Sequence, residues 1–299
     1  MTEIPAIPVP AVPPGPLPFH VLLDEAQRLA RRHFRAIYPA VAIPLALVTT
    51  AVTAIQAHWF SSRMADLGAQ AISFLNPAYL GVTLLHIALL LVGYNAMQVA
   101  AVRATSGAPV DMRQAWRFTV RARTLGTLLL WYAMLFASLG CCCLPVFFVA
   151  PLLSFIPPAM VEEGRFGLQA ISRSVDLARR HPPGRWQESP LIKAALLLLV
   201  GTLLGYLVGL LVSLPFLLPG YVNIFRKAAA GEDFSAGMSS LLWMQVPAQC
   251  LNALASAAVY LYVCFGIALL FHDARGRQEG TDLRAEIESA FPPPGEPGP

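Results

Sequence analysis

Two short acidic or histidine-containing pairs are the residues of this sequence that come closest to catalytic chemistry. His272 and Asp273 are adjacent, but they lack the distant second histidine and aspartate that a phosphohydrolase metal site needs. Glu162 and Glu163 would project about 100° apart on a helix, so they cannot face one substrate as an acid and base pair. We therefore predict no catalytic residue, no metal site and no enzymatic activity.

Three polar residues inside a strongly apolar segment are better functional candidates. His86, Asn95 and Gln98 lie where a polar group must find its partner inside the protein. They can form hydrogen bonds between helices and so stabilise the fold, or they can line a transport path with Gln249 and Asn252. We favour hydrogen bonding between helices, because no charged residue accompanies them in the middle of the segment.

The sequence shows no pattern that would hold a cofactor. Its five cysteines fall in apolar stretches, with no CxxC pair and no histidine at metal-ligand spacing, so we interpret them as small buried side chains. Haem would require two histidines at one depth on facing helices, and the apolar segments do not supply that pair.

The composition indicates the environment in which these residues lie. Of the 299 residues, 56% are hydrophobic and only 13% are charged, and the mean hydropathy is +0.59. A chain of this kind belongs in lipid, where charged side chains are costly. The net charge of +4 is small and the basic residues are scattered, which argues against a nucleic-acid partner. We predict an integral membrane protein.

Six apolar segments are each long enough, or nearly long enough, to cross a bilayer once as a helix. A helix rises about 1.5 Å per residue, so about 20 residues cross the hydrocarbon core. We predict an all-α, polytopic membrane domain over residues 20–291, between disordered proline-rich tails at residues 1–19 and 292–299. The six predicted transmembrane helices cover residues 37–57, 79–101, 124–143, 145–161, 191–214 and 247–271.

The basic residues predict the orientation of these helices. If all six segments cross, every lysine and arginine except Arg63, Arg226 and Lys227 falls on one side, which by the positive-inside rule is the cytoplasm. A re-entrant loop is the alternative for the proline-rich fourth segment, but it would move the basic residues from Arg165 to Lys193 to the other side. We therefore predict a kinked but spanning fourth helix, with both termini cytoplasmic.

An amphipathic stretch precedes each odd-numbered transmembrane helix on the predicted cytoplasmic side. Residues 22–32, 112–121 and 168–180 place apolar side chains and charged side chains on opposite faces. Such helices lie in the headgroup layer, where guanidinium groups bind phosphates. In the third stretch the apolar face comprises Leu168, Ile171, Val175 and Ala178, and the charged face comprises Arg173, Asp176 and Arg180. We predict three interfacial helices, with contacts to lipid or to a partner from Arg113, Arg117, Arg121, Arg173 and Arg180.

Arg275 and Arg277 follow the last predicted transmembrane helix and complete this contact surface. They can bind lipid phosphates, or they can pair with Glu162 and Glu163 at the same side of the membrane. Gly280 permits a turn, after which a last short helix can begin.

Gly201, Gly205 and Gly209 form a GxxxGxxxG run in the fifth transmembrane helix. Three glycines on one face let another helix approach closely. We favour the sixth transmembrane helix as the partner, while the same face of a second copy is the alternative, so a homo-oligomer stays open.

Two motifs resemble a known family of bacterial membrane domains. Residues 157–164 read PPAMVEEG and are followed by AISRS at 170–174, and residues 273–283 place acidic and arginine residues around a Glu-Gly step. This pattern resembles the membrane domain associated with some bacterial glycerophosphoryl diester phosphodiesterases and with many stand-alone proteins, over roughly residues 110–290. The resemblance implies a six-helix bundle of the bacterial cytoplasmic membrane, without assigned activity in most members. It does not imply phosphodiesterase chemistry, because the polar part of this sequence is too short for a catalytic barrel of about 250 residues.

These features together predict a non-enzymatic scaffold, or a subunit of a membrane assembly, in the bacterial inner membrane. It would bind anionic lipid and a protein partner through its cytoplasmic face, without nucleic acid and without a cofactor. The first alternative is a small transporter or lipid-handling protein with its path near His86 and Asn95. The second is an accessory module for a phosphodiesterase, which rests on the family resemblance alone.

Overall fold

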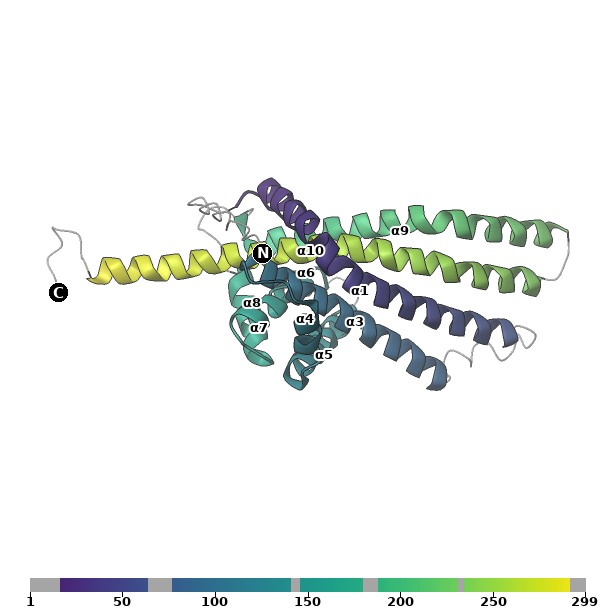
Figure 1. Cartoon of the computed structure of the whole chain (residues 1–299), viewed down its shortest axis with the longest axis horizontal. Coiled ribbons are helices and arrows are strands. Elements are labelled where there is room, and N and C mark those ends of the chain that lie inside the picture. The colour runs from purple at the N-terminus through teal and green to yellow at the C-terminus, as the bar shows by residue number, and fades with distance from the viewer. Residues whose placement is uncertain (1–16, 64–76, 141–145, 180–187, 231–233, 291–299) are drawn as a thin grey trace, which may run out of the picture.

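The computed structural model is an elongated bundle of helices (Figure 1). It describes residues 17–63, 77–140, 146–179, 188–230 and 234–290, and every regular element within these ranges is a helix. Four of these helices are long and apolar enough to cross a membrane: α1 (Phe19–Arg63), α3 (Pro77–Thr105), α9 (Pro190–Ala229) and α10 (Phe234–Ala290). The prediction of an all-α membrane protein is confirmed at this level. The predicted tails lie outside the described residues, apart from residues 17–19, the last of which begins α1.

The described residues also form shorter helices, which gather near one end of the long ones. Figure 1 shows them beside the end of α3 at Thr105, while the long helices continue side by side away from them. The third and fourth predicted transmembrane helices fall on this shorter group. Its members are α4 (Met112–Thr119), α5 (Ala122–Gly140), α6 (Val146–Leu153), α7 (Ile156–Glu162) and α8 (Leu168–Arg179).

The fourth apolar segment is interrupted, whereas we had expected one kinked helix over residues 145–161. It forms α6 and α7, which are separated at Ser154 and Phe155. Pro157 and Pro158 cause the break, because without N–H groups they cannot bond the carbonyls four residues earlier. Both prolines are accepted at the start of α7, where the first N–H groups of a helix have no partner within it.

Ser174 of α8 satisfies two of the backbone groups that this break leaves without helical partners. Its hydroxyl accepts a hydrogen bond from the N–H of Phe155 at 3.2 Å and donates one to the carbonyl of Leu152 at 2.6 Å. Ser174 is fully buried. One side chain from α8 therefore stabilises the junction between α6 and α7.

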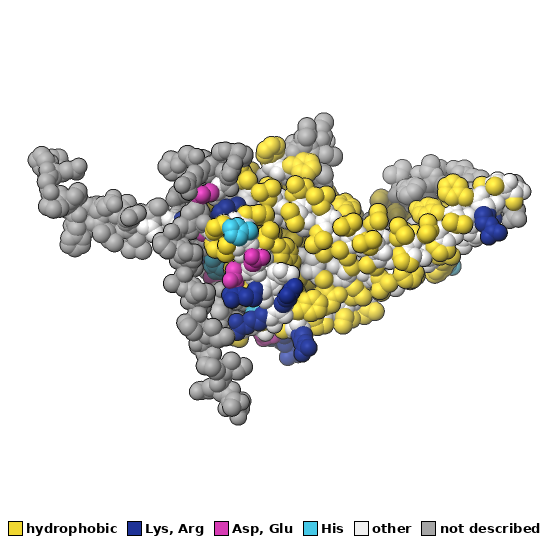
Figure 2. Space-filling view, turned by 90° about the horizontal axis from the view of Figure 1, so that it is seen from above, with side chains coloured by type: hydrophobic (Ala, Val, Ile, Leu, Met, Phe, Trp, Pro, Cys, Tyr) yellow, Lys and Arg dark blue, Asp and Glu magenta, His cyan; other side chains and the backbone are white. Residues whose placement is uncertain are grey.

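The interior of the bundle holds alanines together with large side chains such as Phe265 and Phe271, and many further large apolar side chains lie on the outer surface. α10 packs against α1, α3 and α9, and alanines such as Ala96, Ala257 and Ala268 are fully buried. Large apolar side chains of α9, among them Leu203 and Leu211, are instead about 60% exposed. In Figure 2 hydrophobic side chains cover the sides of the long helices, and we call this part of the molecule the hydrophobic shaft. This distribution suits a protein whose sides contact lipid, because lipid-facing side chains need no covering.

Three glycines of α9, Gly201, Gly209 and Gly220, lie in close contact with α10. A Cβ atom added at Gly201 would collide with the side chain of Val263, and one added at Gly209 would lie 2.5 Å from Oδ1 of Asn252. A Cβ at Gly205 would meet no atom within 4 Å. The fifth and sixth predicted transmembrane helices thus pack through two of the three predicted glycines.

Two long helices, α1 and α10, continue through positions where the sequence allowed a helix to end. α1 runs without interruption from the predicted amphipathic stretch at residues 22–32 into the predicted first transmembrane helix. α10 extends through Gly280 as far as Ala290, so the predicted turn at Gly280 is wrong. Neighbouring side chains on this stretch of α10 favour helix, and one glycine costs only about 1 kcal/mol there.

Candidate functional site

Helix α4 carries the second predicted amphipathic stretch, and its start is fixed by a side-chain cap. The carboxylate of Asp111 accepts hydrogen bonds from the backbone N–H groups of Arg113 and Gln114, at 2.9 and 3.4 Å. One face of α4 is buried through Ala115 and Phe118, and α4 packs against α3. The cap and this packing hold the other face towards solvent.

The exposed face of α4 and the neighbouring face of α1 form a basic surface. Arg113, Arg117 and Arg121 are exposed, and the guanidinium carbon of Arg121 lies 5.7 Å from the centre of the Phe118 ring. α1 contacts α4 and adds further exposed arginines. Figure 2 shows basic side chains gathered at one end of the hydrophobic shaft. We define the arginine surface as Arg31, Arg32, Arg35, Arg113, Arg117, Arg121 and Arg123.

Arg173 does not belong to this surface, because its guanidinium is bound inside the protein. Its Nε lies 2.9 Å from each carboxylate oxygen of Glu163, and its Nη2 lies 2.7 Å from Oε1. Its Nη1 donates to Oε1 of Gln278 at 2.6 Å. Arg173 is only 9% exposed, so it joins α8 to the end of α7 and to α10.

The faces of α8 therefore differ from the predicted pattern. We expected Arg173 and Asp176 to share the exposed face and Leu168 to lie on the apolar one, yet Arg173 is buried and Leu168 is 74% exposed. Ile171 and Ala178 are buried as predicted. The acid that binds Arg173 comes from outside the helix, and helical periodicity alone contains no information about such a partner.

The two arginines after the last predicted transmembrane helix also form ion pairs within the chain. Arg275 lies 3.9 Å from the carboxylate of Glu162, which is one of the two acids considered for it. Arg277 pairs with Asp273, one helical turn earlier. Arg180, the remaining predicted contact, lies outside the described residues.

Asp273 belongs to a small buried cluster at the same end of the bundle. Its carboxylate accepts a hydrogen bond from the N–H of Leu17 at 3.4 Å, and the Lys193 ammonium donates to the carbonyl of Leu17 at 2.7 Å. Asp273 and Lys193 are 6% and 3% exposed. This cluster ties residue 17 to α9 and α10, and we assign it a structural role.

The three polar residues predicted for the membrane interior do not form one common site. His86 shares a 3.1 Å hydrogen bond with the hydroxyl of Thr49 on α1. Asn95 donates to the hydroxyl of Thr119 on α4 at 3.5 Å. Both contacts join neighbouring helices, as expected for residues that stabilise the fold. Gln98 differs from them, because it lies in the wall of a cavity.

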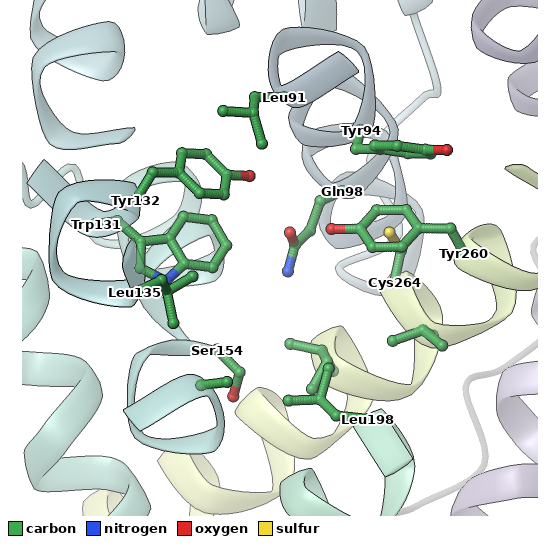
Figure 3. A pocket seen from close by; sticks show the side chains of 13 residues that line it. Leu91, Tyr94, Gln98, Trp131, Tyr132, Leu135, Ser154, Leu198, Tyr260 and Cys264 are labelled. Atoms are coloured by element: carbon green, nitrogen blue, oxygen red, sulfur yellow. The ribbon is translucent and has the colours of Figure 1, made fainter. Parts of the chain in front are cut away.

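The cavity lies between α3, α5, α6, α9 and α10 and has a volume of about 290 Å³. Figure 3 shows Gln98 between two groups of aromatic side chains, with Trp131 and Tyr132 on one side and Tyr94 and Tyr260 on the other. Leucine, valine and isoleucine side chains form much of the remaining wall. Its mostly apolar wall with a few polar groups makes it a candidate small-molecule site.

Sequence analysis missed the aromatic residues of this cavity, because tyrosine and tryptophan are ordinary in apolar segments. A signal was nevertheless present in α3. Tyr94 and Gln98 are four residues apart, so a phenol and an amide share one face of an otherwise apolar helix. The contribution of Trp131 and Tyr260 depends on how α5 and α10 pack, which no local pattern reveals.

Metal binding finds no support among the described residues. No group of three or more histidine, cysteine, aspartate or glutamate side chains there is arranged to hold a metal ion. Cys264 is buried beside the cavity, Cys250 is half-buried, and both are free thiols. The other cysteines, at positions 141–143, lie outside the described residues.

The fold and these surfaces define the class of the protein as an all-helical membrane protein. Comparison with protein-family models, with curated proteins and with solved structures finds no match for this chain. The resemblance of residues 157–164 and 273–283 to the membrane domain family accordingly stays a prediction.

Proposed function

We propose that the protein is a non-enzymatic scaffold, or a subunit of a membrane assembly, that binds anionic lipid of the bacterial cytoplasmic membrane through its arginine surface. The observation that most directly supports this proposal is the position of the exposed arginines of α1 and α4, at one end of the hydrophobic shaft. Guanidinium groups at that level can form charge-assisted hydrogen bonds to phosphates. Electrostatic attraction to anionic lipid adds about 1 kcal/mol for each arginine near the membrane surface.

The proposal includes six crossings, with the arginine surface and both termini in the cytoplasm. α1, α3, α9 and α10 supply four crossings, and α5 followed by α6 and α7 supplies an outward and a return crossing. α5 has 19 residues, so it would be about 28 Å long, close to the hydrocarbon thickness of about 30 Å. The interfacial position of α4 is supported by its buried Ala115 and Phe118 opposite the exposed Arg113 and Arg117.

A protein partner would bind on the same side, next to α8. Leu168 is 74% exposed and lies beside Arg165 and Gln169, both of which are also exposed. A large apolar side chain among polar neighbours is a frequent anchor in protein interfaces. Crosslinking in native membranes should recover a partner that Leu168→Glu loses, while Ser106→Glu, at an exposed position after α3, retains it. Recovery of no partner from either protein would contradict the scaffold proposal.

Lipid binding can be tested by replacing the three arginines of α4 and its C-terminal end together. The variant Arg113→Gln, Arg117→Gln, Arg121→Gln should retain less phosphatidylglycerol after purification, as counted by native mass spectrometry. Arg226→Gln with Lys227→Gln is the matched control, because it removes basic residues from the opposite end of the bundle. Equal retention by the triple variant and the unmodified protein would contradict a lipid-binding arginine surface.

A further inference from the structure

Aromatic side chains line the cavity around Gln98 on two sides. Trp131 and Tyr132 stack with ring centres 4.9 Å apart and an angle of 23° between planes. Tyr94 and Tyr260 form a tilted pair with ring centres 4.5 Å apart. In Figure 3 the hydroxyls of Tyr132 and Tyr260 point towards Gln98 from opposite sides. Aromatic side chains pair with another ring edge to face as well as stacked, so this lining favours an aromatic occupant.

A polar side chain in the cavity wall holds an atom without a hydrogen-bond partner. Oε1 of Gln98 is fully buried, and nothing in the described part of the chain bonds it. Gln98 as a whole is 4% exposed. An unpaired amide acceptor in an apolar interior is destabilising, so a partner supplied by an occupant of the cavity would relieve it.

The walls determine what chemistry an occupant needs. An alkyl chain would fill the volume but would leave the amide oxygen of Gln98 unpaired. A charged molecule would lose its hydration without gaining a counter-charge, since none of the residues that line the cavity is charged. A hydroxyl group on a ring is uncharged and can donate a hydrogen bond to this amide oxygen.

We infer that this cavity binds an uncharged, membrane-soluble ring that carries a hydroxyl group, of the phenol or hydroquinone class. The ring lies between the two aromatic pairs, and its hydroxyl donates a hydrogen bond to Oε1 of Gln98. This site lies inside the bundle and is independent of the arginine surface.

The test measures binding of tritiated 4-propylphenol to the protein in nanodiscs, with empty nanodiscs subtracted. Propylbenzene, which has the same shape without the hydroxyl, is the matched ligand. Saturable binding of the phenol, about tenfold tighter than that of propylbenzene, is expected from the hydrogen bond to Gln98. No saturable binding would overturn the inference and mean that the phenol only partitions into the lipid. Equal binding of both molecules would also overturn it and favour a lipid tail as the occupant.

Two variants separate recognition of the hydroxyl from simple filling of the cavity. Gln98→Met keeps the approximate volume but removes the amide, so it should weaken phenol binding about tenfold and leave propylbenzene unchanged. Ala150→Phe should abolish binding of both by occupying the space. Gln245→Met, outside the cavity wall, should change neither.

The folded state of the variants can be checked without ligand. Gln98→Met should raise the midpoint of thermal unfolding, because it removes an unpaired buried amide. A variant that unfolds at the usual temperature or above and still binds the phenol as tightly as the unmodified protein would refute the role of Gln98.

Discussion

Arg173 and Glu163 form a two-pronged ion pair that joins α8 to the end of α7. Nε and Nη2 of the guanidinium lie 2.7 to 2.9 Å from the carboxylate oxygens, and the two side chains are only 10% and 9% exposed. Arg165 adds a second, more exposed contact to the same carboxylate at 3.0 Å. The pair explains why an arginine of an amphipathic stretch lies inside the protein.

Removing the charge of Glu163 should destabilise the fold strongly. Glu163→Gln leaves the Arg173 guanidinium buried without its counter-charge, and loss of one partner of a buried pair costs about 3–5 kcal/mol. The midpoint of thermal unfolding in detergent should fall accordingly. Asp176→Asn, on the exposed face of α8, should leave the unfolding midpoint nearly unchanged. Equal effects of the two substitutions would show that the pair adds little stability.

Ser174 should matter more than the serine two residues before it. Ser174→Ala leaves the N–H of Phe155 and the carbonyl of Leu152 without a side-chain partner, and each buried unpaired group costs about 1–3 kcal/mol. Ser172 lies on the exposed face of α8, so Ser172→Ala should have almost no effect. Thermal unfolding of both variants checks this. A silent Ser174→Ala would mean that water or a backbone shift replaces the hydroxyl at the α6 to α7 junction.

Gly201 and Gly205 of α9 should respond differently to the same substitution. Gly201→Leu must displace Val263 of α10 and should cost about 1–3 kcal/mol through overpacking. Gly205→Leu meets open space and should be tolerated. The measurement is the unfolding midpoint in a common detergent. If Gly205→Leu instead dissociates a dimer that Gly201→Leu leaves intact, that glycine face contacts a second copy.

The number of crossings can be tested at the end of α5. Gly140 is exposed and a Cβ atom there meets nothing within 4 Å, so Gly140→Cys should fold normally. In a protein whose own cysteines are replaced by alanine, six crossings predict that a membrane-impermeant maleimide labels this position in intact cells. Protection from the label in both intact cells and inverted vesicles would instead show that α5 and α6 enter the membrane without crossing it.

The long helices and the two ends of the bundle could be predicted from the sequence, because they depend on local quantities. Apolar length predicts α1, α3, α9 and α10, and the spacing of glycines predicts the α9 to α10 contact through Gly201 and Gly209. Both signals lie within one segment. The interruption between α6 and α7 was underestimated, since prolines mark a weak point but do not show whether a neighbour such as Ser174 will stabilise a full break.

The rest of the candidate site depends on contacts between distant segments. Arg173 looked like a headgroup contact because its partners Glu163 and Gln278 both lie outside α8, and Gln278 is 105 residues away. Gln98 was noted as a polar residue at membrane depth. It does not share a site with His86 and Asn95, because His86 contacts α1, Asn95 contacts α4 and Gln98 lies in the cavity wall. Charge pairing and cavities of this kind are properties of the assembled bundle.

The most direct test of the central claim compares labelling at the two ends of the bundle. Gln114→Cys lies on the exposed face of α4 beside the arginine surface, and Ala229→Cys lies at the far end of α9. In a background free of other cysteines, a membrane-impermeant maleimide should label Ala229→Cys in intact cells and Gln114→Cys only in inverted vesicles. Labelling of both positions from the same side would contradict a bundle that crosses the bilayer with its arginines in the cytoplasm.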